Sequence, residues 1–283
     1  MGASAQSILN GFLAKGIGKA CTIAFSPRCG STVLSNTLSR FGVGLPTEYF
    51  QYPYDENVFF SSHDEKDVLS NISELVSNHA PNGIFSSKMT HDHRAYLDDQ
   101  LRSRLDGYNA IDDILPLHKW IFMRRKDTVA QAVSWYVAET SSQWHLSSAS
   151  HVIKHQNIEY DFFSILSRLM IIGANNANWD TYFKVAGIFP LDIIYENLVS
   201  DPLSEVSAIL EYLDIDRPVS DVVLERDGGL KQISKHSSAI YRTLESRFID
   251  DFMKIGQTND RVRLGPSLDK WNSFFFQSQW RNG

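Results

Sequence analysis

Cysteine and long apolar runs are both scarce in this sequence. Only two cysteines, Cys21 and Cys29, occur among 283 residues. That number is too small for a disulfide framework and favours a reducing compartment. No apolar run approaches the roughly 18 to 20 residues that a membrane-spanning helix needs, and the N-terminus lacks the long apolar core of a signal peptide. We therefore expect a cytoplasmic protein with no transmembrane segment.

Basic residues are also in the minority. Lys and Arg total 27 against 33 Asp and Glu, which gives a formal net charge of −6. General nucleic-acid binding depends on a basic surface, so we expect no nucleic-acid partner. An anionic ligand would need a local basic pocket. With 43% hydrophobic and 21% charged residues, the composition is that of a globular protein.

Internal repeats and low-complexity linkers are absent, and short β-rich runs alternate with helical patterns. Strands are predicted at 21–26, 83–89, 119–125 and 190–197. Helices are predicted at 31–42, 126–144 and 200–215. The second helix has Asp127 or Thr128 as its N-cap, and the third has Asp201. The alternation predicts an α/β fold, a P-loop-like parallel sheet flanked by helices, with the ligand site at the carboxyl ends of the strands.

Two stretches, residues 52–82 and 91–117, interrupt this alternation. We interpret them as helical or loop insertions that shape an acceptor pocket. The length suits one large domain or two small ones, and we expect the whole chain, residues 1–283, to form a single domain that carries these insertions.

The first predicted strand runs into the loop "SPRCGST" at 26–32. Backbone N–H groups at a loop-to-helix junction point outward, and the helix dipole adds positive potential, so such a junction favours an anion. Gly30 lets the backbone approach a ligand closely, and Arg28 offers a planar cationic fork for a phosphate or sulfate. Ser31 and Thr32 could bond the anion or cap the helix. An ordinary strand-turn-helix is the structural alternative, and local spacing does not decide between the two.

Two other phosphate chemistries fit this loop poorly. A P-loop carries a lysine immediately before its Ser or Thr, and Gly30 occupies the position before Ser31. A phosphatase-type loop pairs its cysteine with an arginine at the end of the same loop, and counted from Cys29 that position is Ser35. We therefore interpret Cys29 as a small packed residue and not as a nucleophile.

Three segments taken together resemble the sulfotransferases, and within them the trehalose 2-sulfotransferase family. They are "SPRCGSTVLSNTL" at 26–38, "GLPTEYFQY" at 44–52 and "FMRRKDTVAQAVSWYVAETSSQW" at 122–144. The fourth predicted strand, the helix after it and "VVLERDGG" at 222–229 follow the family order. The resemblance implies the sulfotransferase fold. It also implies metal-free transfer of the sulfuryl group of 3′-phosphoadenosine-5′-phosphosulfate (PAPS) to a sugar hydroxyl, which releases the 3′,5′-bisphosphate PAP.

The resemblance further implies roles for particular residues. The 5′-phosphosulfate would bind the loop at Arg28, Cys29, Gly30, Ser31 and Thr32. The 3′-phosphate would bind Arg125 and Ser134, with Arg124 open as the alternative arginine because the sequence reads "RRKD". Glu48 falls on the general base of the family, and Lys88 falls on a lysine at the end of the next strand.

The chemistry gives these residue types a purpose. Negative charge builds on the leaving group during sulfuryl transfer, and Arg28, Lys88 and the loop N–H groups suit its stabilisation. A sugar hydroxyl is a poor nucleophile, so a base such as Glu48 is worth about 10²- to 10⁴-fold in rate. Acceptor-binding residues are predicted at Glu48, Tyr49, Gln51 and Trp144.

Other candidates stay open. Lys231 and Lys235 are late basic residues that could bind the 3′-phosphate or lie on the solvated surface. No cluster has metal-ligand spacing, and "HDH" at 91–93 comes closest. A P-loop-type kinase and a non-catalytic PAP-binding protein are the alternative functions. The expected partner is a small-molecule or glycolipid sugar, and the family suggests a homodimer.

Overall fold

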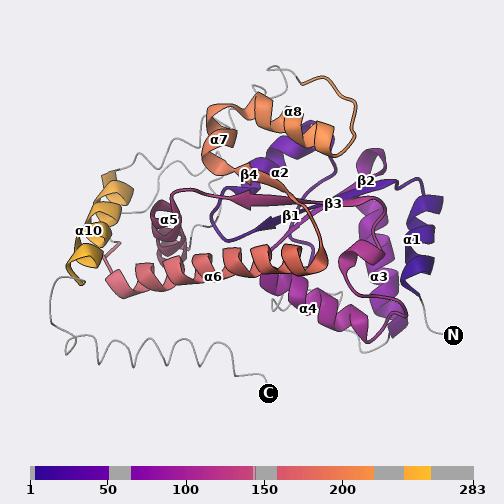
Figure 1. Ribbon diagram of the computed structural model, residues 1–283, viewed down its shortest axis with the longest axis horizontal. Coiled ribbons are helices and arrows are strands. Elements are labelled where there is room, and N and C mark those ends of the chain that lie inside the picture. Colours follow the sequence, from indigo (N-terminus) through magenta and orange to yellow (C-terminus); the bar gives the residue numbers. More distant parts are fainter. Residues whose placement is uncertain (1–3, 51–64, 143, 145–157, 220–238, 256–283) are drawn as a thin grey trace. The chain divides into compact units, whose positions relative to one another are not determined.

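The computed structural model describes residues 4–50, 65–142, 144, 158–219 and 239–255 (Figure 1). The chain divides into two compact units, which are treated separately here. The first unit comprises Met1–Lys126 with Asn175–Ile233, and the second comprises Asp127–Ala174 with Ser234–Gly283. The single domain expected from the chain length stays a prediction.

A four-stranded sheet forms the centre of the first unit. Its strands are β1 Lys19–Phe25, β2 Ile84–Met89, β3 His118–Arg124 and β4 Leu191–Ile194. Their order is β2-β1-β3-β4, and every neighbouring pair is parallel. The predicted α/β fold with a parallel sheet is therefore confirmed.

The fourth strand is shorter than predicted. Residues 195–197 were expected to continue it, but helix α7, Tyr195–Ser200, begins there. The register explains the difference, because Ile194 pairs with Arg124, the last residue of β3. Beyond that point β4 has no strand to pair with, and the chain turns into a helix.

Helices cover both faces of this sheet (Figure 1). On one side lie α2 Ser31–Arg40, α7 and α8 Pro202–Tyr212, and on the other lie α1 Ala5–Ala14, α3 Glu65–Asn78 and α4 His91–Arg102. Alternate residues of β1 enter two different cores, Cys21 and Ile23 on the α2 side and Ala20 and Ala24 on the α4 side. Strands buried on both faces read as continuous apolar runs, which is why β1 was visible in the sequence.

The two predicted insertions have different outcomes. Residues 51–64 lie outside the described part of the chain, whereas 65–78 form α3. The 91–117 stretch forms α4 and the short 3₁₀ helix η2 Ile111–Asp113; a second such turn, η1 Pro81–Gly83, precedes β2. Buried apolar residues of both insertions join the core on the α4 side. A role for them in an acceptor pocket stays a prediction.

The second unit is helical among its described residues. It contains α5 Thr128–Ser141, α10 Ala239–Ile255 and the first half of α6, Phe162–Ala186. Its core joins Val133 and Val137 of α5, Ile165 and Ile172 of α6, and Phe248 of α10. The helices predicted over 126–144 and 200–215 are confirmed as α5 and α8. Their N-caps are Asp127 and Asp201, whose side chains accept hydrogen bonds from the N–H groups of Ala130 and Ser204.

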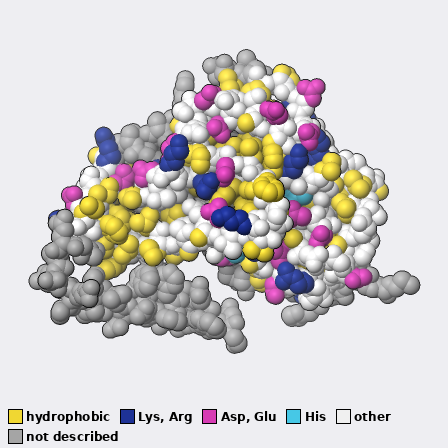
Figure 2. Space-filling model, in the orientation of Figure 1, with side chains coloured by type: hydrophobic (Ala, Val, Ile, Leu, Met, Phe, Trp, Pro, Cys, Tyr) yellow, Lys and Arg dark blue, Asp and Glu magenta, His cyan; other side chains and the backbone are white. Residues whose placement is uncertain are grey.

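Surface charge is mixed where it can be seen. On the face in Figure 2, Lys and Arg side chains are interspersed with Asp and Glu, and no extended basic patch is visible. Among the helices that the structure describes, none is both long enough and apolar enough to cross a bilayer.

Candidate anion-binding site at the carboxyl ends of the strands

The loop between β1 and α2 has an unusual backbone. Arg28 and Gly30 both have positive φ angles, 66° and 100°. A left-handed arginine is uncommon, and such strain, of about 1 to 3 kcal/mol per residue, concentrates at functional sites. Gly30 is the N-cap of α2 and supplies no side-chain hydrogen bond to the first turn. The first turn of α2 therefore receives no cap from its N-cap residue, although the backbone of Ser31 bonds the Cys29 thiol.

Lys88 connects this loop to Glu48. It is the penultimate residue of β2, and its side chain is only 8% exposed. Its Nζ lies 3.3 Å from Thr32 Oγ1 and 2.9 Å from Glu48 Oε1. The same ammonium lies 5.3 Å from the centre of the Phe25 ring at the end of β1. The structure thus brings two predicted site residues, Thr32 and Glu48, each into contact with a third, Lys88.

Glu48 reaches this place through a backbone contact. After α2 the chain returns to the sheet, where Thr47 forms a parallel bridge with Ser87. The Lys88 N–H donates to the Thr47 carbonyl oxygen at 2.9 Å. This pairing sets Glu48 beside the end of β2, which a local sequence pattern does not specify.

Arg125 is a nearly buried cation just after β3. It is 8% exposed. Among the described residues, no group accepts a hydrogen bond from its Nε, and the Glu196 carboxylate lies 3.8 Å away. A buried N–H donor without an acceptor is costly, so the Nε of Arg125 favours an anionic ligand at this place.

The neighbouring arginine has a different environment. Arg124 donates to Asp192 Oδ1 at 2.8 Å and lies over the Phe122 ring at 4.9 Å. Successive side chains of a strand point to opposite faces, which separates the two arginines. Arg124 is thus already paired with a carboxylate, and the geometry favours Arg125 as the anion ligand.

Sequence reasoning missed two residues of this site, Tyr195 and Glu196. The ring of Tyr195 lies against Gly30, because a Cβ added to Gly30 would meet Tyr195 Cδ2 at 2.3 Å. The guanidinium carbon of Arg125 lies 5.0 Å from the centre of the same ring. Glu196 accepts a hydrogen bond from the Lys126 N–H at 3.0 Å. The available signal was their position among the last residues of the predicted strand 190–197, at its carboxyl end.

Cys29 is fully buried in the loop. Burial raises the pKa of its thiol to about 12, despite hydrogen bonds from the backbone of Ser31 and Ser26 and the charges of Lys88 and Arg125. The reactive form of a cysteine is the thiolate. Cys29 therefore stays protonated at neutral pH and acts as a packed residue, as its position in the loop had suggested.

The other predicted site residues that the structure describes are Ser134, Trp144 and Tyr49. Ser134 is buried on α5, and Trp144 is 44% exposed; both belong to the second unit, so each is described only within that unit. Tyr49 donates its hydroxyl to the Leu45 carbonyl at 2.8 Å, and its ring packs on Phe85. The roles of these three residues stay predictions. Residues outside the described part of the chain are Gln51, Lys231, Lys235 and 222–229.

Metal-ligand geometry is missing from the described residues, where no group of three His, Cys, Asp or Glu side chains could hold an ion. In the "HDH" segment, His91 packs edge-on against Trp179, with ring centres 5.4 Å apart, and its Nε2 lies 3.2 Å from Arg94. This histidine is therefore part of the packing at the start of α4.

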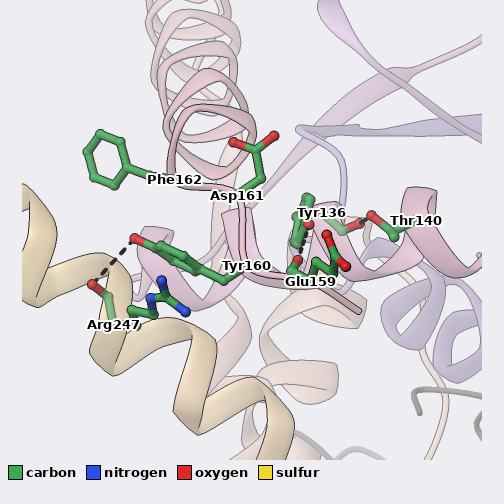
Figure 3. Close-up of a pocket in the computed structure, with 7 residues that line it drawn as sticks. All are labelled: Tyr136, Thr140, Glu159, Tyr160, Asp161, Phe162 and Arg247. Atoms are coloured by element: carbon green, nitrogen blue, oxygen red, sulfur yellow. Dashed lines mark hydrogen bonds between the residues drawn. The ribbon is translucent and has the colours of Figure 1, made fainter. Parts of the chain in front are cut away.

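A separate cavity of about 740 Å³ lies in the second unit (Figure 3). Its polar groups mostly bond one another: the Tyr136 hydroxyl donates to the Glu159 carbonyl, and the Tyr160 hydroxyl donates to Asp251 at 2.9 Å. The carboxylate of Asp161 accepts from Ser164 at the start of α6. With acidic side chains in its wall, this cavity is a poor place for a phosphosulfate. Its lining residues are Tyr136, Thr140, Glu159, Tyr160, Asp161, Phe162 and Arg247.

Comparison with known proteins points to one family. The family model of the Stf0 sulphotransferases matches residues 20–239 of this chain. Trehalose 2-sulfotransferase of Mycobacterium tuberculosis is 25% identical over 234 residues, which cover 71% of this chain and 87% of that protein. The sulfotransferase domain of the Synechococcus PCC 7002 olefin synthase is 18% identical, with 75% of this chain and 76% of that one covered, at a TM-score of 0.33. The family-model match carries the assignment, because it spans most of the chain.

Proposed function

The chain belongs to the Stf0 sulphotransferase family, and we propose that it transfers the sulfuryl group of PAPS to a hydroxyl of a carbohydrate or glycolipid acceptor. The observation that carries this proposal is Arg125, a cation 8% exposed whose Nε has no acceptor among the described residues. It lies at the same end of the sheet as the uncapped first turn of α2 and Lys88. PAPS carries two anionic groups, a 5′-phosphosulfate and a 3′-phosphate. The first would bind the first cationic place, formed by the first turn of α2 and Lys88, and the second would bind the second cationic place, at Arg125.

The first cationic place would hold the 5′-phosphosulfate. Backbone N–H groups at a helix N-terminus are aligned toward an anion and need no reorganisation when charge develops. Arg28 adds a permanent charge, and Thr32 adds a hydroxyl that Lys88 already contacts at 3.3 Å. Gly30 has no side chain, which lets the Tyr195 ring pack directly against the N-cap of α2.

The second cationic place would hold the 3′-phosphate, which distinguishes PAPS from ATP. A guanidinium binds phosphate through two parallel N–H bonds. The Nε of Arg125 has no acceptor among the described residues, and its guanidinium carbon lies 5.0 Å from the centre of the Tyr195 ring. Ser134 would complete this place, as the resemblance implies.

Lys88 and Glu48 would carry the transfer. Glu48 would take the proton of the acceptor hydroxyl, whose oxygen then forms a bond to sulfur. The bond from sulfur to the 5′-phosphate oxygen breaks, and PAP leaves with the electron pair. Lys88 would donate to that leaving oxygen, and its contacts with Thr32 at 3.3 Å and Glu48 at 2.9 Å place it between loop and base. General-base catalysis by Glu48 is worth about 10²- to 10⁴-fold.

The acceptor is proposed to be a sugar. A relative that is 25% identical is a trehalose 2-sulfotransferase, so trehalose is the first compound to try. Tyr49, Gln51 and Trp144 are the proposed acceptor contacts, and no metal is invoked. A homodimer is proposed on the family resemblance alone.

A transfer assay tests this function. The protein is incubated with PAPS and a panel of di- and oligosaccharides and glycolipids, without added metal, and products are examined by mass spectrometry. We expect PAP to be released in step with one sulfated acceptor. PAP binding without transfer to any acceptor would favour the non-catalytic alternative, and a phosphorylated product that forms only with ATP and Mg²⁺ would favour a kinase.

A further inference from the structure

We propose that Tyr195 is a positioning residue of this site, whose ring holds both the anion loop at Gly30 and the guanidinium of Arg125 in their ligand-binding arrangement. The proposal rests on the proposed function, since it concerns the same donor site. The Tyr195 ring contacts both the Gly30 position of the loop and the guanidinium of Arg125.

The first contact is with Gly30. A Cβ at this position would lie 2.3 Å from Tyr195 Cδ2 and 2.8 Å from Cε2, and 3.2 Å from Met123 Cε. The tyrosine ring thus fills the space into which any other side chain would project. Because the ring lies directly against the N-cap of α2, it also prevents the loop from moving toward β4.

The second contact is with Arg125. The guanidinium carbon lies 5.0 Å from the centre of the Tyr195 ring, within the range of a cation–π interaction. This interaction orients the plane of the guanidinium but uses none of its N–H groups. Glu196 lies 3.8 Å from Nε and neutralises part of the charge. The cation is therefore held in place while its Nε, which has no acceptor among the described residues, stays available for a ligand.

The charges around the ring agree with this placement. Burial raises the pKa of the Tyr195 phenol, and the charges of both Arg125 and Arg28 act on it in the opposite direction. Two cations from two different loops therefore lie near one aromatic ring.

The ring itself is fixed by the start of α7. Ile194 pairs with Arg124 at the end of β4, and Tyr195 follows as the first helical residue. Glu196 accepts from the Lys126 N–H at 3.0 Å, and Lys126 Nζ donates to Asn197 Oδ1 at 3.4 Å. These bonds fasten the first turn of α7 to the segment that carries Arg125, so the ring has a defined direction.

Two substitutions separate the ring from the hydroxyl. Tyr195→Met keeps most of the volume but has no aromatic face, and we expect PAP binding to weaken about 5- to 30-fold. Tyr195→Phe keeps the face, and we expect PAP binding within about threefold of wild type. Steady-state kinetics should show the Tyr195→Met loss as a higher KM for PAPS with an unchanged KM for the acceptor.

A matched control comes from the opposite end of the sheet. Tyr212 on α8 is another half-buried tyrosine with a nearby cation, since Lys119 Nζ lies 5.1 Å from the centre of its ring. Lys119 precedes Arg125 by six residues, roughly 20 Å along an extended strand. Tyr212→Met should therefore lower thermal stability as much as Tyr195→Met does, without weakening PAP binding.

The titrations distinguish the possible failures. If Tyr195→Phe weakens PAP binding as much as Tyr195→Met, the hydroxyl and not the ring matters, and the proposal is wrong. If Tyr195→Met binds PAP like wild type, the positioning role is refuted, while wild-type binding still supports the proposed function. A wild-type protein that does not bind PAP would overturn both. Tyr195→Leu serves as the second variant should Tyr195→Met fail to fold.

Discussion

Replacement of Arg125 by methionine is expected to separate ligand binding from stability. The guanidinium is 8% exposed, lies against the Tyr195 ring, and has the Glu196 carboxylate at 3.8 Å. Each charge-assisted hydrogen bond to a phosphate is worth about 1.5 to 3 kcal/mol. Loss of one such bond would weaken PAP binding about 10- to 150-fold.

The expected effect on folding has the opposite sign. A buried charge that lacks hydrogen-bond partners is held at a cost, and an apolar side chain of similar size removes this cost. Glu196 would keep its hydrogen bond from the Lys126 N–H, so its carboxylate would not be left unpartnered. We therefore expect Arg125→Met to leave the free energy of unfolding unchanged or to raise it by about 1 kcal/mol.

Calorimetric titration with PAP and chemical unfolding without ligand measure the two effects. Arg124→Met is the matched control, because Arg124 makes a largely exposed ion pair with Asp192, worth at most about 1 kcal/mol. It should bind PAP like wild type. Unchanged PAP binding in Arg125→Met, or an equal loss in both variants, would refute the 3′-phosphate assignment and the reasoning from burial.

Three further outcomes are expected. Glu48→Gln should keep PAP affinity and lower turnover by about 10²-fold or more; equal turnover in single-turnover assays would remove Glu48 from the mechanism. Gly30→Ala should abolish measurable PAP binding, since its Cβ would lie 2.3 Å from Tyr195 Cδ2 and its φ is 100°; retained binding would show that the loop moves freely. The Cys29 thiol has its pKa raised from 9.0 to about 12, so above pH 9 the unfolded state loses its proton first and stability falls with pH. Cys29→Ala should therefore lose less unfolding free energy than wild type between pH 8 and pH 11. An equal loss in both proteins would contradict the raised pKa of the buried Cys29 thiol.

The sheet was visible in the sequence for a physical reason. Its strands are buried on both faces, so their apolar runs and the helical patterns between them are strong signals. The N-caps Asp127 and Asp201 were visible as well, because capping acts within a few residues. The predicted end of β4 was wrong, because the length of this strand depends on where its partner β3 stops and not on the residues of β4 itself.

The site shows the same division between local and long-range effects. The loop at Arg28 and Gly30 could be recognised from one continuous stretch. The contact between Lys88 and Glu48 depends on a backbone bridge between Thr47 and Ser87, which are far apart in the sequence. Tyr195 could not be assigned from the sequence alone, because its place against Gly30 follows only from the parallel order of β1, β3 and β4.

The most direct test of the account is a calorimetric titration of the wild-type protein with PAP, compared with ATP plus Mg²⁺. The central claim is that the loop at Gly30 and the cation at Arg125 bind the two anionic groups of a 3′,5′-bisphosphate donor. It predicts micromolar PAP binding without metal and much weaker ATP binding. Binding of ATP with no response to PAP would contradict it.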